Sequence, residues 1–284
     1  MQVSLYPGCS LDGVAREYKE SLEAVSATMG IELKELQDWI CCGASSAHIT
    51  NDKLAVGLAA SNLAIAEKAG RDLVVPCAAC YHRLKVAEKH LLQGKPVDGY
   101  AGKYTGKIQV KDMVDYVWEN VGEKAIKARV KKSLKALNAV CYYGCLVARP
   151  PKVTDTKSFE NPQEMDKVMK AVGVTVKAWT YKTDCCGGSL VLTRPDIAYK
   201  MTQKLLDAAA EAGAEAIVVS CPLCQSNLDV RQAEISAQTG KTYATPIFYF
   251  SELLGLAFGD PSATKWVSRH LTDAMPLLRQ KGLV

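Results

Sequence analysis

The chain has 284 residues, of which 48% are hydrophobic and 23% charged, and a formal net charge of +5. This length accommodates two domains of ordinary size, and the composition excludes a disordered or low-complexity protein. No apolar stretch reaches the roughly 18 residues of a membrane span, and the N-terminus lacks the features of a signal peptide. We therefore expect a cytoplasmic protein that does not bind nucleic acid, because its mild positive charge forms no long basic tract.

The first half of the chain alternates segments with the periods of strands and helices. Gly30 and Gly70 each follow an amphipathic segment, as glycine does at the ends of helices. In chain order we expect a strand at 2–6, a helix at 14–29, a strand at 31–33, a helix at 53–69, a strand at 72–76 and a helix at 78–92.

The second half repeats this order. We expect a strand at 137–142, a helix at 163–172, a strand at 174–178, a helix at 195–212 and a strand at 216–220. The glycine-rich segment 94–111 is expected to link the halves, and 112–132 to add helix. The segment 251–278 is also expected to be helical, with no counterpart in the first half.

This alternation predicts an α/β fold of two pseudo-symmetric modules, each a small parallel or mixed sheet with flanking helices. We expect the first module at residues 1–110, a helical connection at 111–136, and the second module with a C-terminal helical tail at 137–284.

Ten of the eleven cysteines form two matched groups of five. Four cysteines of the first group recur 144 positions later, and the fifth, which follows a glycine, recurs 136 positions later. The second copy therefore has eight additional residues after this fifth cysteine. The first group is Cys9, Cys41, Cys42, Cys77 and Cys80, and the second is Cys145, Cys185, Cys186, Cys221 and Cys224. The expected elements place these cysteines at strand ends and helix starts, so each group can converge on one site.

Metal binding is the chemistry that this pattern favours. A reducing compartment and an odd number of cysteines argue against a disulfide framework. A redox-active dithiol at Cys77 and Cys80 would leave the other three thiols of its group unexplained. Zinc uses four thiolates, so five would leave one in excess, although zinc in one module stays open. Iron-sulfur clusters account best for five convergent thiolates.

The pattern Cys9…Cys41-Cys42-Gly43…Cys77-x-x-Cys80, with its repeat, resembles the tandem CCG domain of the B-type component of heterodisulfide reductase. The resemblance implies that each module holds a noncubane 4Fe-4S cluster through its five cysteines, and that a disulfide is reduced between the clusters by two one-electron transfers. It also implies two partners in a larger complex, one a ferredoxin-like subunit, the other flavin-containing. The disulfide would belong to a small molecule or a carrier protein.

Two alternatives remain at this point. CCG modules are also similar to parts of 2-hydroxy acid, glycerol-3-phosphate and succinate or fumarate oxidoreductases, where the chain would be an electron-transfer subunit. In a different class, the chain would be a zinc-binding scaffold subunit.

A few other residues are candidates for supporting roles. His82 is the candidate proton donor to a product thiolate, because it follows Cys80 by two positions. Arg83, Lys85 or Arg149 could attract an anionic substrate. Cys141 is expected to be a buried strand residue. The additional residues of the second copy, within 149–161, are expected to be where the two modules differ.

Overall fold

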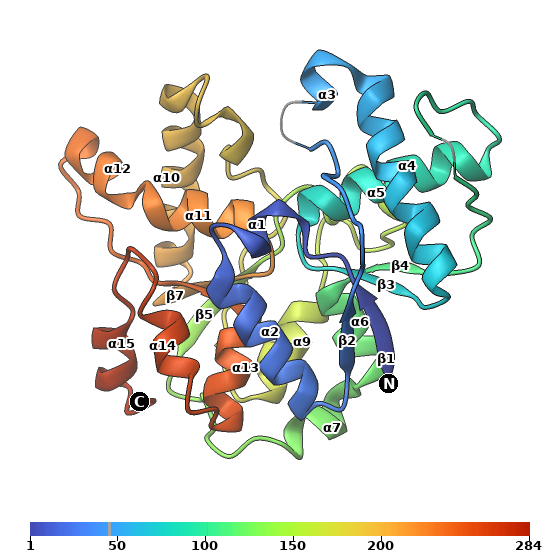
Figure 1. Cartoon of the computed structure of the whole chain (residues 1–284). Coiled ribbons are helices and arrows are strands. Elements are labelled where there is room, and N and C mark those ends of the chain that lie inside the picture. The colour runs from blue at the N-terminus through green and yellow to red at the C-terminus, as the bar shows by residue number, and fades with distance from the viewer. Residues whose placement is uncertain (45–46, 101) are drawn as a thin grey trace.

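The computed structural model describes residues 1–44, 47–100 and 102–284. Two four-stranded parallel sheets organise the chain, with strand orders β2-β1-β3-β4 and β6-β5-β7-β8. Since each order is the same when counted from the first strand of its own half, the expected α/β fold of two pseudo-symmetric modules is confirmed. Figure 1 shows the sheets side by side, with helices on their faces.

The first sheet consists of β1 (Gln2–Leu5), β2 (Glu32–Glu35), β3 (Leu73–Val75) and β4 (Val110–Asp112). In register, Val3 pairs with Leu33, and Leu5 pairs with Val74. All three residues of β3 are fully buried, as is typical of a strand in a parallel sheet covered on both faces.

The second sheet repeats this plan with β5 (Asn138–Tyr142), β6 (Thr175–Val176), β7 (Ala216–Val219) and β8 (Ile247–Tyr249). β5 pairs with β7 from Ala139 to Tyr142, and β7 pairs with β8 from Ile217 to Val219. β7 is buried over its whole length, like β3.

Helices connect the strands of both modules. In the first half they are α1 (Gly8–Asp12), α2 (Arg16–Thr28), α3 (Ala47–Thr50), α4 (Asp52–Ala69), α5 (Ala78–Leu92), α6 (Met113–Asn120) and α7 (Gly122–Lys127). In the second half they are α8 (Pro151–Thr154), α9 (Glu164–Ala171), the 3-10 turn η1 (Gly188–Leu190), α10 (Pro195–Glu211), α11 (Pro222–Val230), α12 (Gln232–Thr239), α13 (Phe250–Phe258), α14 (Ala263–Val267) and α15 (Met275–Gln280).

β4 and β8 correct two expectations from the sequence. The segment 94–111, expected to be a linker, ends in β4, and α6 follows β4 as α13 follows β8. The C-terminal tail therefore begins with a helix that does have a counterpart in the first half. The expected domain boundaries, after residue 110 and after residue 136, stay a prediction. β4 crosses the first of these boundaries.

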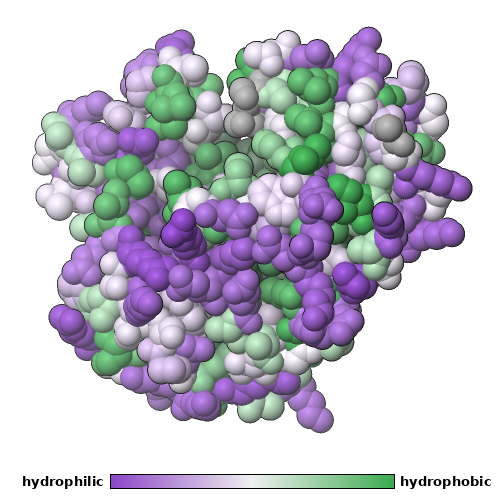
Figure 2. All heavy atoms as spheres, viewed as in Figure 1, coloured by the Kyte–Doolittle hydropathy of each residue, from purple (hydrophilic) through white to green (hydrophobic). Residues whose placement is uncertain are grey.

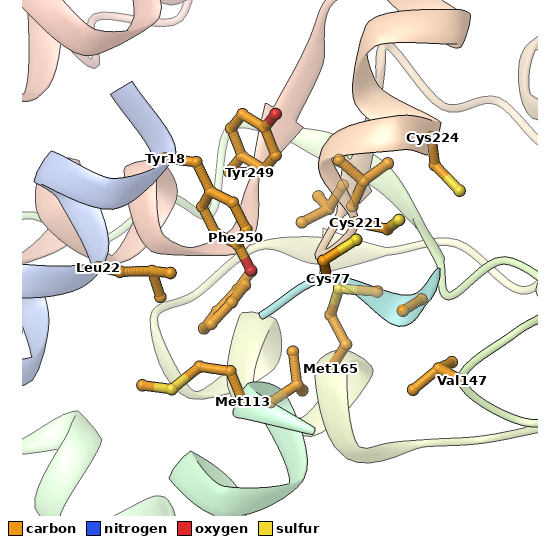
Figure 3. Packing of buried hydrophobic residues seen from close by; sticks show 14 of the residues in the cluster. Tyr18, Leu22, Cys77, Met113, Val147, Met165, Cys221, Cys224, Tyr249 and Phe250 are labelled. Atoms are coloured by element: carbon orange, nitrogen blue, oxygen red, sulfur yellow. The ribbon is translucent and has the colours of Figure 1, made fainter. Parts of the chain in front are cut away.

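The helix that follows the last strand of each module packs on a helix of the other module. α6, from the first half, packs on α9 of the second, and α13, from the second half, packs on α2 of the first. At the centre of this interface Tyr18 stacks on Tyr249 with ring centroids 4.0 Å apart and donates a 2.8 Å hydrogen bond to the carbonyl oxygen of Ser220 (Figure 3). Ser21 and Ser251 lie 2.7 Å apart across the same contact. The apolar core is consequently continuous between the modules.

Candidate metal centres

The cysteines lie at the carboxyl ends of the parallel strands, where such sheets collect ligands. β1 leads into Cys9 and β5 into Cys145, each through a glycine. Cys77 and Cys221 follow β3 and β7 and are the N-cap residues of α5 and α11, with extended backbones. Parallel strands thus bring the cysteines of each group to one edge of its sheet.

In the first module, side-chain contacts link Cys41, Cys42, Cys80 and Cys77. The Sγ atoms of Cys42 and Cys80 are hydrogen bonded at 3.3 Å, and the amide of Gly43 donates to Cys41 Sγ at 3.4 Å. Cys42, Cys77 and Cys80 are buried, whereas Cys9 and Cys41 are exposed. The hydrogen bond with Cys80 is the main reason that the pKa of Cys42 is lowered to about 7, which favours the thiolate that binds metals.

The second module repeats these contacts. Cys186 Sγ and Cys224 Sγ lie 3.7 Å apart, and the amide of Gly187 donates to Cys185 Sγ at 3.4 Å. The hydrogen bond with Cys145 lowers the pKa of Cys185 to about 6. The exposure follows the first module, with the Cys145 and Cys185 thiols nearest to solvent.

The two groups meet through the first cysteine of each CxxC motif. Figure 3 shows the side chains of Cys77 and Cys221 close together between the modules, and each thiol affects the pKa of the other. This contact raises the pKa of Cys77, whereas the pKa of Cys221 is lowered, first by Cys224 and then by Cys77. The two groups of cysteines therefore lie next to each other at the module interface. Figure 2 shows the surface hollowed between the upper ends of the two modules.

Glycines allow the backbone to approach the sulfur atoms closely. Gly8 has φ +63°, and a Cβ atom there would lie 3.0 Å from Cys80 Sγ. Gly144 has φ +72°, and its Cβ would lie 3.0 Å from Cys224 Sγ. Five convergent thiols in such a cradle fit a thiolate-ligated iron-sulfur cluster. Among the described residues, no three or more His, Cys, Asp or Glu side chains are arranged to hold a single metal ion.

Two tyrosines support the cysteine loops, a role that the sequence did not suggest for either of them. The hydroxyl of Tyr6 donates to the carbonyl oxygen of Ile40 at 2.7 Å, and that of Tyr142 donates to the carbonyl oxygen of Asp184 at 2.7 Å. Each acceptor is the residue immediately before a Cys-Cys pair, so Tyr6 and Tyr142 join the carboxyl ends of β1 and β5 to these pairs. The signal was available, because Tyr6 and Tyr142 have the same 136-residue offset as Cys9 and Cys145.

The candidate supporting residues lie in different environments. His82 is half-buried, and burial, followed by Arg83, lowers its pKa to about 4, so its imidazole is neutral near pH 7. Lys85 is buried in an ion pair with Glu88. Cys141 is fully buried in β5, where its pKa is raised by desolvation.

The additional residues of the second module contact the first module. Tyr81 on α5 donates to the carbonyl oxygen of Thr154 at 3.4 Å, and Lys89 pairs with Asp155 at 2.6 Å. α8 therefore packs against the helix that carries Cys80. Arg149, at the start of this segment, lines a separate cavity of about 530 Å³ beside α9 together with Lys182.

Comparisons with known proteins agree with this architecture. The cysteine-rich domain family CCG matches residues 3–85 and 139–229. A Wolinella succinogenes protein named 8-methylmenaquinol:fumarate reductase membrane anchor subunit is 32% identical, over 97% of this chain and 99% of that protein. A Methanosarcina mazei protein, named as the B-type component of a ferredoxin:CoB-CoM heterodisulfide reductase, is 25% identical, over 91% of this chain and 89% of that protein. The resemblance inferred from the cysteine spacing is thus confirmed.

A solved structure shares the fold. The crystal structure of a hypothetical protein from Helicobacter pylori matches 96% of this chain with a TM-score of 0.75, at 13% sequence identity. This chain spans 52% of that chain. In the part of the chain that the structure describes, no helix combines the length and apolarity needed to cross a membrane.

Proposed function

Because the chain belongs to the CCG cysteine-rich domain family and contains two copies of the domain, we propose that it is the iron-sulfur subunit of a heterodisulfide reductase-like complex. In this proposal it reduces a disulfide with two electrons, delivered one at a time. The relatives named as subunits of heterodisulfide reductases and of a fumarate reductase support membership of an oxidoreductase complex.

Each group of five cysteines would hold one noncubane 4Fe-4S cluster. The first site uses Cys9, Cys41, Cys42, Cys77 and Cys80, and the second uses Cys145, Cys185, Cys186, Cys221 and Cys224. When bound, such clusters supply single electrons and a Lewis-acidic iron for a leaving thiolate. Gly43 and Gly187 donate to a thiol in each site and so orient it, and Tyr6 and Tyr142 hold the loops in place.

The contact between Cys77 and Cys221 is the observation that carries the proposal. Figure 3 shows these two residues close together at the module interface, which supports two neighbouring five-cysteine sites. Cleavage of a disulfide requires two electrons and gives two thiols, and two adjacent one-electron sites match this requirement. A single cluster-binding module would not.

The electrons would come from partner subunits. The sequence contains no nucleotide-binding fingerprint and no ferredoxin motif. By family, the electron donors would be a ferredoxin-like subunit together with a flavin-containing one. The disulfide substrate, of a small molecule or a carrier protein, would enter where Cys9 and Cys41 are exposed.

A second function is favoured by the fumarate reductase relative, which is 32% identical over nearly its whole length. In this alternative the same two sites pass electrons between partner subunits, and no disulfide is bound. The two functions differ in whether a disulfide interacts with the clusters.

The distinguishing experiment uses the anaerobically purified chain and the heterodisulfide of coenzyme M and coenzyme B as probe. Disulfide reduction predicts that the probe changes the electron paramagnetic resonance (EPR) spectrum of both sites. It also predicts that, with an added one-electron donor, Cys42→Ala or Cys186→Ala abolishes turnover. His82→Gln tests His82 as the candidate proton donor. Because burial lowers its pKa to about 4, a role in proton donation would show as a loss of turnover in this variant toward acidic pH. Unchanged spectra, or full turnover in either cysteine variant, would contradict disulfide reduction at two clusters and favour the electron-transfer function.

A further inference from the structure

The two cysteine sites differ in the charged residues around them. α5 begins at Ala78 and α11 at Pro222, which is the same 144-residue offset as that of the two CxxC motifs. Residues 144 positions apart in this part of the chain therefore occupy corresponding places in the two modules. Arg83 in the first module corresponds to Asn227 in the second, and Ile40 corresponds to Asp184. The cysteines are the same in the two copies, whereas the charges next to them are not.

Arg83 places a positive charge beside the first site. It follows Cys80 by three positions on α5, so both residues lie on the same face of the helix. Its side chain is only 16% exposed, and its one ion pair among the described residues, to the exposed Asp52, is long at 3.7 Å. Arg83 is also the charged side chain that acts on Cys42, where it adds to the stronger effect of the hydrogen bond with Cys80.

The corresponding residue of the second site carries no charge. Asn227 is buried, and its amide donates to the carbonyl oxygen of Cys186 at 2.8 Å and to Thr202 Oγ1 at 2.9 Å. It therefore fixes the Cys-Cys loop by hydrogen bonds and leaves the charge of the site unchanged.

An acidic residue adds to this difference. Asp184 precedes Cys185 directly and acts electrostatically on its thiol, whereas the first module has Ile40 at this position. Lys204 lies 3.6 Å from Asp184, and both side chains are well exposed. Water therefore screens the charge of Asp184 as well as this pair, so Arg83, which is 16% exposed, makes the larger contribution.

Other ionisable groups near the two sites do not cancel the difference. Lys182 of the second module forms a buried ion pair with Asp166 at 2.7 Å, and the pair as a whole is neutral. The first site therefore has an extra positive charge, and the second an extra negative one.

We propose that Arg83 and Asp184 make the two clusters inequivalent, so that the cluster of the first module accepts an electron at a higher potential than the cluster of the second. The inference rests on the proposed function, because it needs a cluster in each module. Reduction adds one negative charge to a cluster, which a nearby cation stabilises and a nearby anion destabilises. The first electron from a one-electron donor reduces the first cluster, the second electron reduces the second cluster, and no bond forms or breaks in either step.

The order of reduction gives the two sites different roles toward a disulfide. The substrate sulfur atom next to the first module would face the site that is reduced first. This is also the site with the additional cation. An asymmetric disulfide with one anionic half would therefore orient that half toward Arg83.

A potentiometric titration of the anaerobically purified chain, followed by EPR and visible absorption, tests the inference. The unaltered protein should show two one-electron steps, and Cys186→Ala should retain the one at higher potential. Arg83→Asn, which copies the second module, should move the higher step down. At the original midpoint, the ratio of reduced to oxidised cluster should fall about tenfold, which corresponds to about 59 mV. Arg83→Lys should restore the step, and Asp184→Asn should move the lower step up.

Lys127→Asn is the matched control, because it removes one positive charge from α7, at the opposite end of the molecule from the cysteine loops (Figure 1). It should move neither step. The inference is overturned if the protein contains iron and sulfide but Arg83→Asn moves neither step, or only the lower one. A preparation without iron and acid-labile sulfide would instead overturn the proposed function.

Discussion

Gly8 offers a sharp test of how the backbone forms the first site. Gly8→Ala introduces a Cβ atom 3.0 Å from Cys80 Sγ, on a backbone with φ +63°. A left-handed conformation costs a residue other than glycine about 1–2 kcal/mol. Non-bonded atoms prefer separations of about 3.5–4.0 Å, so the sulfur must also move by about 0.5 Å or more.

The sulfur cannot move without disturbing its neighbours. Cys80 is 4% exposed and lies 3.3 Å from the Cys42 sulfur, so a shift of Cys80 displaces a second ligand. Metal-ligand distances tolerate only about 0.2 Å. We therefore expect Gly8→Ala to lose the cluster of the first module, and with it about half of the iron, while the second cluster remains.

Gly30→Ala is the control for backbone strain alone. Gly30 has φ +78°, and a Cβ atom there would meet nothing within 4 Å among the described residues. Urea unfolding of the metal-free chain should show a loss of about 1–2 kcal/mol in Gly30→Ala, and a larger loss in Gly8→Ala. Iron and sulfide analysis should show full occupancy only in Gly30→Ala. Full occupancy in Gly8→Ala, or equal iron loss in both variants, would refute the argument.

Three further predictions concern stability, and the first two test contacts between the modules. Tyr18→Phe removes the 2.8 Å hydrogen bond to Ser220 but retains the ring that stacks on Tyr249, so urea titration should show a loss of about 1–3 kcal/mol, and an unchanged unfolding midpoint would count against this contact. Asp155→Asn breaks a pair with Lys89 in which Asp155 is 56% exposed, and should cost less than about 1 kcal/mol; a larger loss would show that α8 depends on this pair. His270 lies 3.0 Å from Glu252. Burial lowers the pKa of His270, but the negative charges of Glu252 and Asp229 raise it by more, so the pKa of His270 is raised overall. The free energy of unfolding that this raised pKa contributes should be fully present below the pKa of His270 in the unfolded chain, and it should decline as the pH rises through the higher pKa of the folded chain. In His270→Gln the free energy of unfolding should lack this decline, and a pH profile identical to that of the unaltered protein would contradict the prediction.

The sequence predicted the elements that have strong local signals. The helix expected at 78–92 is present with the same bounds, and the helix expected at 53–69 begins one residue earlier, where Asn51 caps it by accepting from the amide of Leu54. β3 and β7 were anticipated because they are continuous apolar segments that end at Cys77 and Cys221. Hydrophobic periodicity, capping residues and glycine stops are all properties of neighbouring residues, which a single sequence displays.

The missed features depend on contacts between distant residues. β4 and β8 have three residues each, too few to show a period, and they are defined by pairing with β3 and β7. The stacking of Tyr18 on Tyr249 joins residues from opposite ends of the chain. For the same reason the contact of Asp155 with Lys89 could not be foreseen. The cysteine groups were identified by their repeat, whereas the meeting of Cys77 and Cys221 appears only in the folded chain.

Metal and sulfide analysis of the anaerobically purified chain tests the central claim, that each module holds an iron-sulfur cluster, most directly. Two four-iron clusters predict about eight iron atoms and about eight acid-labile sulfides per chain, with no zinc. Zinc without iron, as a scaffold subunit would contain, or iron for one cluster only, would contradict the account.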